Sequence, residues 1–253
     1  MHSAALAEMG LAQEWTYEAI EVSPEDFEGL VRSLPEQGFR GVNVTIPHKV
    51  AALSLANEAS EAAREIGAAN TLGFADGLIA AENTDAAAIA EALPYAPRGA
   101  RALVLGAGGS ARAAVWALRE AGAEVNVWNR TSAKAEALAD EMGVGLDPRD
   151  PEIVVNATAV GLEAANGVQP LSERGEPDLK PFPVFDDGLK AEVVMDLVYG
   201  SRETDLIEAA RAAGAATVDG LEILARQGAA SLRLWTGMEP PLGTMRRAAR
   251  GSE

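Results

Sequence analysis

Apolar residues recur along the second half of the chain at two spacings, and these spacings predict the fold. The runs 102–105 and 125–128 have the length of buried strands, and the segment between them is apolar at 111, 114, 115 and 118, which is helical spacing. Further strands are expected at 153–155, 193–195 and 216–218, and helices at 133–142, 204–213 and 221–235. Strands and helices that alternate in this order predict an α/β protein with a doubly wound parallel sheet.

The first part of the chain predicts a smaller α/β unit. Strands are expected at 16–20, 41–45, 68–74 and 78–81, with Asp76-Gly77 as a hairpin turn between the last two. Ser23 followed by Pro24 is typical of a helix start, so a helix is expected to about residue 34. Further helices are expected at 4–11, 49–56 and 84–93, the last capped by Thr84 or Asp85. Residues 166–187, rich in proline, glycine and charge, predict a loop.

A glycine turn joins the strand at 102–105 to the helix that follows it. Its residues are Gly106, Ala107, Gly108, Gly109, Ser110 and Ala111. In a strand–turn–helix–strand unit this is the dinucleotide-binding fingerprint, in which Gly106 permits the tight turn and Gly108 lets the backbone approach a pyrophosphate. Small Ala111 lets the helix pack closely, and the helix N-terminus offers N–H groups to the phosphate. The alternative is an ordinary glycine-rich turn.

The residues after the strand at 125–128 indicate which nucleotide is bound. NAD-binding units usually carry a carboxylate there, whereas this chain has Asn129-Arg130-Thr131, with Lys134 one turn further on. A guanidinium with hydroxyl and amide groups suits the 2′-phosphate of NADP, which a carboxylate would repel. The alternative is that Arg130 and Lys134 are solvated surface residues. The sequence favours NADP as the cofactor.

Composition narrows the class of protein. The chain has 253 residues, 48% of them hydrophobic, and a formal net charge of −17 from 21 basic and 38 acidic residues. The electrostatic field of so negative a chain repels nucleic acid and anionic membranes, so neither is an expected partner. There is no cysteine, no apolar run long enough for a membrane span and no signal-peptide pattern, so a cytoplasmic protein is expected, and no metal site.

Three segments ahead of the glycine turn place polar residues at the ends of expected strands. They are Asn43-Val44-Thr45 with Lys49, Asn70-Thr71, and Asn83-Thr84-Asp85. Strand ends line the ligand crevice of α/β sheets, and these groups suit a small molecule with hydroxyls and a carboxylate. Reduction of a carbonyl also needs a proton donor, which Lys49 and Asp85 supply as a hydrogen-bonded pair. Taken singly, each residue has an ordinary alternative as a turn, cap or surface residue.

These motifs together resemble the shikimate dehydrogenases, in family order and over nearly the whole chain. The matching stretches are 43–49, 67–71, 83–85, 106–111, 129–131, 156–158 with Gly161, 196–199 and 220–227. The resemblance implies a substrate-binding α/β domain at 1–93, a Rossmann-type NADP-binding domain at 94–220 and carboxy-terminal helices at 221–253. The helix at 221–235 is expected to pack back on the first domain.

The resemblance also implies a reaction and roles for individual residues. The reaction is the NADP-linked interconversion of 3-dehydroshikimate and shikimate in chorismate and aromatic amino-acid biosynthesis. Lys49 would be the proton donor and acceptor, with Asp85 its partner. The substrate would be held by Thr45, Asn70, Asp85, Tyr199 and Gln227. The cofactor would be held by Gly106, Ala107, Gly108, Gly109, Ser110, Asn129, Arg130, Thr131, Lys134, Leu197 and Gly220.

The amino terminus departs from the family pattern. Members begin with a strand and a Ser-x-Ser stretch whose hydroxyls bind the substrate carboxylate, whereas this sequence starts at Met1-His2-Ser3, so that strand and both serines are expected to be absent. Two alternatives therefore stay open. One is a variant that prefers quinate, and the other is an NADP-binding protein without catalysis. A homodimer is a further possibility.

Overall fold

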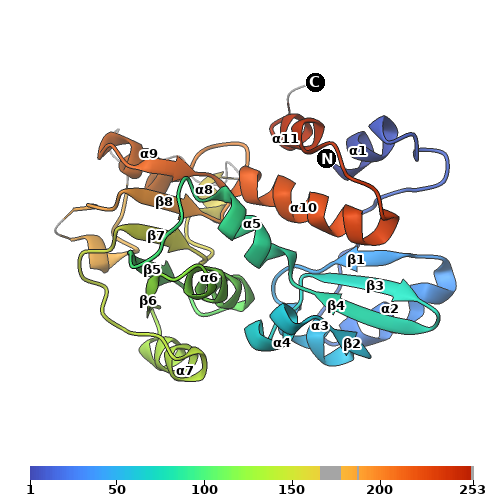
Figure 1. The fold of residues 1–253 in the computed structure, drawn as a ribbon, viewed down its shortest axis with the longest axis horizontal. Coiled ribbons are helices and arrows are strands. Elements are labelled where there is room, and N and C mark those ends of the chain that lie inside the picture. Colours follow the sequence, from blue (N-terminus) through green and yellow to red (C-terminus); the bar gives the residue numbers. More distant parts are fainter. Residues whose placement is uncertain (166–177, 187, 252–253) are drawn as a thin grey trace. The chain divides into compact units, whose positions relative to one another are not determined.

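Two separate sheets organise the chain, one mixed and one parallel (Figure 1). The computed structural model describes residues 1–165, 178–186 and 188–251. The described chain divides into two units, the first formed by Met1–Ala88 with Leu224–Glu253 and the second by Ile89–Ile223. Two helices, α5 (Thr84–Ala92) and α10 (Gly220–Thr236), carry the chain from one unit to the other.

The first unit holds a four-stranded sheet in the order β1-β3-β4-β2. The strands are β1 (Gly41–Asn43), β2 (Glu58–Ala59), β3 (Thr71–Ala75) and β4 (Leu78–Glu82). β3 and β4 form the expected hairpin around Asp76 and Gly77, whose φ angles of 50° and 74° are those of a tight hairpin turn. β1 runs antiparallel to β3, and β2 runs parallel to β4.

Helices pack against the sheet of the first unit and against one another. They are α1 (His2–Glu8), α2 (Phe27–Ser33), η1 (Pro35–Gln37), α3 (Lys49–Leu55), α4 (Glu61–Ile66), α11 (Leu242–Ala249) and parts of α5 and α10. A core of Phe27, Val31, Leu34, Leu72 and their neighbours packs α2 against the sheet. A second cluster packs α1 and α11 against α10. The indole of Trp235 on α10 donates to the Leu72 carbonyl oxygen at 3.0 Å, which anchors α10 to β3.

The second unit is a five-stranded parallel sheet in the order β6-β5-β7-β8-β9. The strands are β5 (Arg101–Leu105), β6 (Glu124–Trp128), β7 (Ile153–Asn156), β8 (Val193–Asp196) and β9 (Ala216–Val218). The helices are α6 (Gly109–Glu120), α7 (Ser132–Met142), α8 (Leu162–Ala165) and α9 (Asp205–Ala212), with a 3-10 turn η2 (Pro183–Phe185). The prediction of an α/β protein with a doubly wound parallel sheet is confirmed.

Two predictions about where strands and helices begin were wrong. Residues 16–20 form no strand in the described chain, because their backbone pairs neither with β1, whose outer edge stays unpaired, nor with any other described strand. The helix expected after Ser23 begins later, at Phe27, because the Ser23 hydroxyl accepts from the Asp26 amide at 3.2 Å and closes a turn first. Most of the predicted loop at 166–187 lies outside the described residues.

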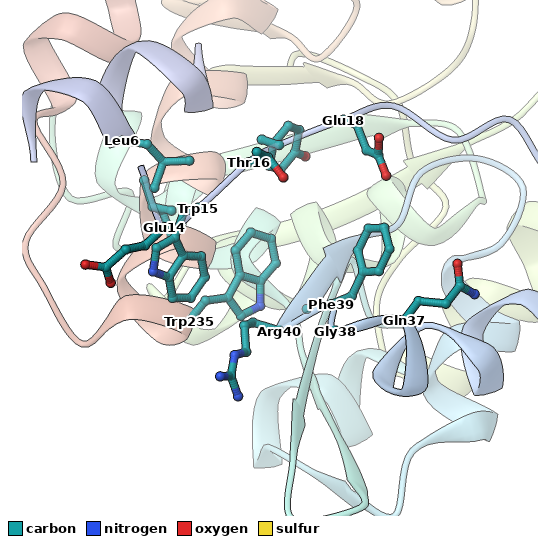
Figure 2. A pocket seen from close by; sticks show the side chains of 13 residues that line it. Leu6, Glu14, Trp15, Thr16, Glu18, Gln37, Gly38, Phe39, Arg40 and Trp235 are labelled. Atoms are coloured by element: carbon teal, nitrogen blue, oxygen red, sulfur yellow. The ribbon is translucent and has the colours of Figure 1, made fainter. Parts of the chain in front are cut away.

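A groove of about 520 Å³ follows the open edge of β1. Figure 2 shows Thr16 and Glu18 on one side of it and Phe39 and Arg40 on the other. Gly41 is one of its lining residues, and a Cβ atom there would come within 2.1 Å of the Trp235 indole nitrogen, so α10 can approach β1 only over glycine. None of the site residues predicted from the sequence lines this groove.

Candidate active site and cofactor site

A buried ion pair stands at the ends of two helices of the first unit. Lys49 Nζ donates to Asp85 Oδ2 at 2.6 Å, and each side chain retains 11% of its exposed surface. Lys49 is the first residue of α3 and Asp85 lies in the first turn of α5, where the helix dipole stabilises a carboxylate. Because both charges are buried, each needs the other as a partner, since an unpaired charge in this poorly solvated position would destabilise the fold.

Neighbouring side chains hold these two residues in place. The Asn83 side chain accepts from the Ala86 amide at 3.3 Å and therefore caps α5, so the expected cap at Thr84 or Asp85 was wrong. Because Asn83 serves as the cap, the Asp85 carboxylate is available to Lys49. On the other side, the His48 ring stacks on Phe27 with centroids 4.4 Å apart, which fixes the start of α3.

Asn70 joins the ion pair to α10. Its Nδ2 lies 2.9 Å from Asp85 Oδ1 and 3.3 Å from Gln227 Oε1, while its Oδ1 accepts from the Thr84 amide at 2.7 Å. The structure therefore brings together Lys49, Asn70, Asp85 and Gln227, which lie far apart in the sequence. Amide, ammonium and carboxylate groups in one cluster are able to donate to and accept from a polyhydroxylated ligand.

The other two residues predicted to hold the substrate belong to different segments of the chain. Thr45 is exposed in the turn between β1 and α3, where its carbonyl oxygen accepts from the His48 amide at 2.9 Å. Tyr199 belongs to the second unit, after β8, and is 44% exposed. The roles of both residues toward the substrate stay predictions.

Sequence reasoning placed Thr71 and Thr84 in its polar segments but missed Ser231, which joins them in one set of hydroxyls. Thr71, Thr84 and Ser231 are all buried and lie within 2.8–3.2 Å of one another. Asn43 donates to Ser231 Oγ at 2.7 Å. One signal was available in the sequence, because Ser231 follows Gln227 by four residues and so lies on the same face of a helix.

In the second unit, the glycine turn has the geometry expected of a phosphate-binding loop. Gly106 has a φ angle of 117°, and a Cβ atom there would lie 2.9 Å from the Ala157 carbonyl oxygen, so only glycine fits. Gly108 is an extended N-cap of α6 without a side-chain hydrogen bond, and space around its Cα is open. The first amides of α6 have no acceptor within the helix and therefore suit an anion. Ala107 completes the turn, and Gly109 and Ser110 are the first two residues of α6.

The segment after β6 carries the basic residues. Asn129 Nδ2 donates to the Thr131 carbonyl oxygen at 3.0 Å, which folds the turn ahead of α7. Arg130 and Lys134 are exposed, and neither forms an ion pair among the residues that the structure describes. By contrast, Arg112 on α6 is paired with Glu141. Exposed cations that form no ion pair and lie next to a helix N-terminus are suited to bind a phosphate group.

Two buried polar residues lock the ends of β7 and β8. Asn156 Nδ2 donates to Asp196 Oδ1 at 2.8 Å, and both residues are fully buried. The next residue, Leu197, is held by a bond from its amide to the Asn156 carbonyl oxygen at 2.9 Å. Gly220 begins α10, where a Cβ atom would lie 2.4 Å from the Val198 carbonyl oxygen, so glycine permits the close approach.

Three family descriptions match successive parts of this chain. "Shikimate dehydrogenase substrate binding domain" matches residues 1–72, "Shikimate / quinate 5-dehydrogenase" matches residues 88–150, and "Shikimate 5'-dehydrogenase C-terminal domain" matches residues 220–250. A shikimate dehydrogenase (NADP(+)) of Methanocella arvoryzae is 42% identical over 265 residues, which cover 99% of this chain and 92% of the relative. The chain belongs to the shikimate dehydrogenase family. These matches give no evidence of a missing strand or serine motif.

Solved structures agree with this membership. The shikimate 5-dehydrogenase of Thermus thermophilus, in complex with NADP(H) and shikimate, is 40% identical to this chain, with a TM-score of 0.84. The match covers 99% of this chain and 92% of that one. The ligand-free 5-ketofructose reductase of a Gluconobacter strain is 28% identical with a TM-score of 0.81, and the match covers 98% of this chain and 91% of that one. No helix in the described part of this chain is long and apolar enough to cross a membrane.

Proposed function

We propose that this chain interconverts 3-dehydroshikimate and shikimate with NADP, and that Lys49 carries the proton. The buried contact of 2.6 Å between Lys49 and Asp85 is the observation that supports this assignment most directly. Family membership supports the shikimate dehydrogenase activity and the use of NADP. The proposal assigns residues 1–93 to the substrate and residues 94–220 to the cofactor.

Reduction of the carbonyl requires one hydride at carbon and one proton at oxygen. NADPH supplies the hydride when it is bound. Lys49 donates the proton from Nζ to the oxygen that becomes the hydroxyl group, and in the reverse direction it takes that proton back. Asp85 keeps Nζ oriented through Oδ2 and stabilises the ammonium form before the proton leaves. Asp85 Oδ1 is meanwhile held by Asn70 at 2.9 Å, which fixes the plane of the carboxylate.

Substrate recognition falls to the amide and hydroxyl groups around this pair. Asn70 and Gln227 each carry one acceptor and two donors on the side chain, which matches vicinal hydroxyls that both donate and accept. We propose that Thr45 and Tyr199 add two further hydroxyl contacts. The 5-ketofructose reductase has the same fold, so these contacts, not the fold, must set the choice among hydroxylated ketones.

The cofactor fits residues of the second unit. The uncapped start of α6, with Gly106 to Ser110, suits the pyrophosphate. Arg130, Thr131 and Lys134 would hold the 2′-phosphate, with Asn129 shaping the turn beneath it. We propose that Leu197 and Gly220 would also hold the cofactor.

A spectrophotometric assay at about 340 nm, where NADPH absorbs, tests the proposal. The purified chain should reduce NADP with shikimate, and Lys49→Ala should lower kcat by about 10²–10⁴-fold, the usual contribution of general acid–base catalysis. Lys190→Ala, which removes an exposed lysine, is the matched control and should behave as the wild type.

Each alternative predicts a different result in the same assay. A quinate enzyme would turn over quinate faster than shikimate. A protein without catalysis would bind NADP and reduce none of it with either compound. Unchanged kcat in Lys49→Ala would remove the proton role of Lys49 while leaving the reaction itself intact.

A further inference from the structure

Ser231 is a buried hydroxyl on α10, and it contacts groups from four different segments. It is fully buried, and its Oγ lies 2.7 Å from Asn43 Nδ2, 2.8 Å from Thr71 Oγ1, 3.2 Å from Thr84 Oγ1 and 2.9 Å from the Gln227 carbonyl oxygen. A serine hydroxyl has one proton and two lone pairs, so these contacts leave its hydrogen-bonding capacity saturated.

The chemistry of the partners determines the direction of each bond. A carbonyl oxygen only accepts, so Ser231 donates its proton to Gln227, and an amide nitrogen only donates, so Ser231 accepts from Asn43. One lone pair remains, and Thr71 is the nearer of the two threonines. Thr71 therefore donates to Ser231 and is not free to donate to Asn70 Oδ1, which lies 3.2 Å away.

These bond directions determine the orientation of the Asn70 side-chain amide. With Thr71 committed to Ser231, the Thr84 hydroxyl is the one left to donate to Asn70 Oδ1, at 3.2 Å. The Asn70 amide is then held with its oxygen toward the Thr84 amide and its nitrogen toward Asp85 and Gln227. Ser231 also bonds the backbone of Gln227 itself, one helical turn earlier.

We propose that Ser231 is a positioning residue for substrate binding, which fixes the orientation of the Asn70 amide and the place of Gln227 on α10. This inference rests on the proposed function, in which Asn70 and Gln227 hold the hydroxyls of shikimate. Ser231 is fully buried and acts only through these two residues. Its loss therefore weakens the binding of shikimate and leaves cofactor binding unchanged.

Steady-state kinetics of Ser231→Ala test the proposal. The KM for shikimate should rise about tenfold, in keeping with the loss of one buried hydrogen bond. The KM for NADP should stay at the wild-type value. Thr236→Ala is the matched control, since Thr236 Oγ1 makes the same kind of bond to a carbonyl oxygen on α10, that of Leu232 at 2.7 Å, outside the network. It should change neither KM.

A spectroscopic signature separates positioning from general destabilisation. In ¹H–¹⁵N spectra, the side-chain amide resonances of Asn70 should shift in Ser231→Ala and stay in place in Thr236→Ala. Thr71→Val removes the next hydroxyl in the series without changing the side-chain volume. It replaces Ser231→Ala if that variant fails to fold, and it should likewise raise the KM for shikimate and leave the KM for NADP unchanged.

The outcomes distinguish this inference from the proposed function. If the wild type and Thr236→Ala oxidise shikimate while Ser231→Ala and Thr71→Val keep the wild-type KM for it, the positioning role is wrong and the function stands. An equal rise in both KM values, with unmoved Asn70 resonances, would also overturn it. If no form of the chain oxidises shikimate, the proposed function fails first.

Discussion

Lys49 Nζ lies 2.6 Å from Asp85 Oδ2, although 36 positions separate the two residues in the sequence. The contact joins the first turn of α3 to the first turn of α5, so the ion pair fastens two helices of the first unit as well as preparing a proton donor. Both side chains are largely buried, at 11% exposure. Removing one partner should therefore destabilise the fold more than at an exposed pair, because the other charge would be left buried and unpaired.

The first prediction is a coupling between these two residues in stability. Lys49→Met and Asp85→Asn should each lower the free energy of unfolding by about 3–5 kcal/mol if the partner is left as a buried unpaired charge. The double variant should lose less than the sum, because no charge then remains. Urea unfolding of the four proteins measures this cycle. Strictly additive losses would mean that the pair is not coupled.

Cofactor choice gives a second prediction. Arg130→Ala should weaken NADP binding by about 10–100-fold, because a hydrogen bond to a charged group contributes about 1.5–3 kcal/mol. Binding of NAD, which lacks the 2′-phosphate, should not change. Arg211→Ala is the control. It removes an exposed arginine of α9 that is paired with Glu203, and it should affect neither nucleotide. Equal weakening of both nucleotides would place Arg130 away from the 2′-phosphate.

The glycine turn supplies a third prediction, with a matched pair of variants. Gly106 and Gly99 both have positive φ angles, 117° and 75°, but a Cβ atom meets the Ala157 carbonyl oxygen only at Gly106. Gly99→Ala should cost about 1–2 kcal/mol of stability, the penalty of a left-handed conformation. Gly106→Ala should cost more and should also weaken NADP binding. Titration calorimetry and urea unfolding compare the two, and equal effects would contradict the close approach.

Local sequence rules succeeded where the chemistry of neighbouring residues is sufficient. Asp76-Gly77 predicted the β3–β4 hairpin because few residue pairs accept two positive φ angles in succession. Gly106 predicted a turn that admits no side chain, and the polar ends of three segments predicted that Lys49, Asn70 and Asp85 would meet. In each case the sequence itself carries the constraint.

Other features depend on partners that a sequence does not display. Residues 16–20 have the composition of a strand, yet a strand exists only where a neighbour pairs with its backbone groups. Ser231 resembles any small polar residue on a helix, and its contacts with Asn43, Thr71 and Thr84 arise only when α10 packs on the sheet. Tertiary packing decides such positions, and the helical spacing that places Ser231 on the same face as Gln227 does not show what that face contacts.

Hydrogen exchange offers a fourth prediction, on the unpaired segment. Backbone amides in residues 16–22 should exchange rapidly, because in the described chain this segment belongs to no sheet. Amides of β3, paired on both sides by β1 and β4, should be protected by several orders of magnitude and serve as the internal control. Strong protection of residues 16–22 would show that they pair with a strand in solution.

The last prediction concerns pH and comes from Asp196. Burial raises the pKa of this carboxyl to about 6, although the Thr204 hydroxyl, the Val198 amide and the Asn156 side chain all donate to it and oppose the rise. Because the folded pKa exceeds the unfolded value of 3.8, the folded state binds more protons between these two pH values. The contribution of Asp196 to stability is therefore fully present below about pH 4 and is lost as the pH rises through about 6.

Asp196→Asn removes this titration while retaining the shape of the side chain. The Thr204 hydroxyl can turn to accept from the new amide, so the ends of β7 and β8 should stay joined. The difference in unfolding free energy, wild type minus variant, should fall by on the order of 3 kcal/mol between pH 4 and pH 7, at about 1.4 kcal/mol per pKa unit. Urea unfolding across this range measures the difference, in which all other titrating groups cancel. Parallel stability curves for the two proteins would mean that the carboxyl titrates normally, and the network around Asp196 would then be solvated more than its burial indicates.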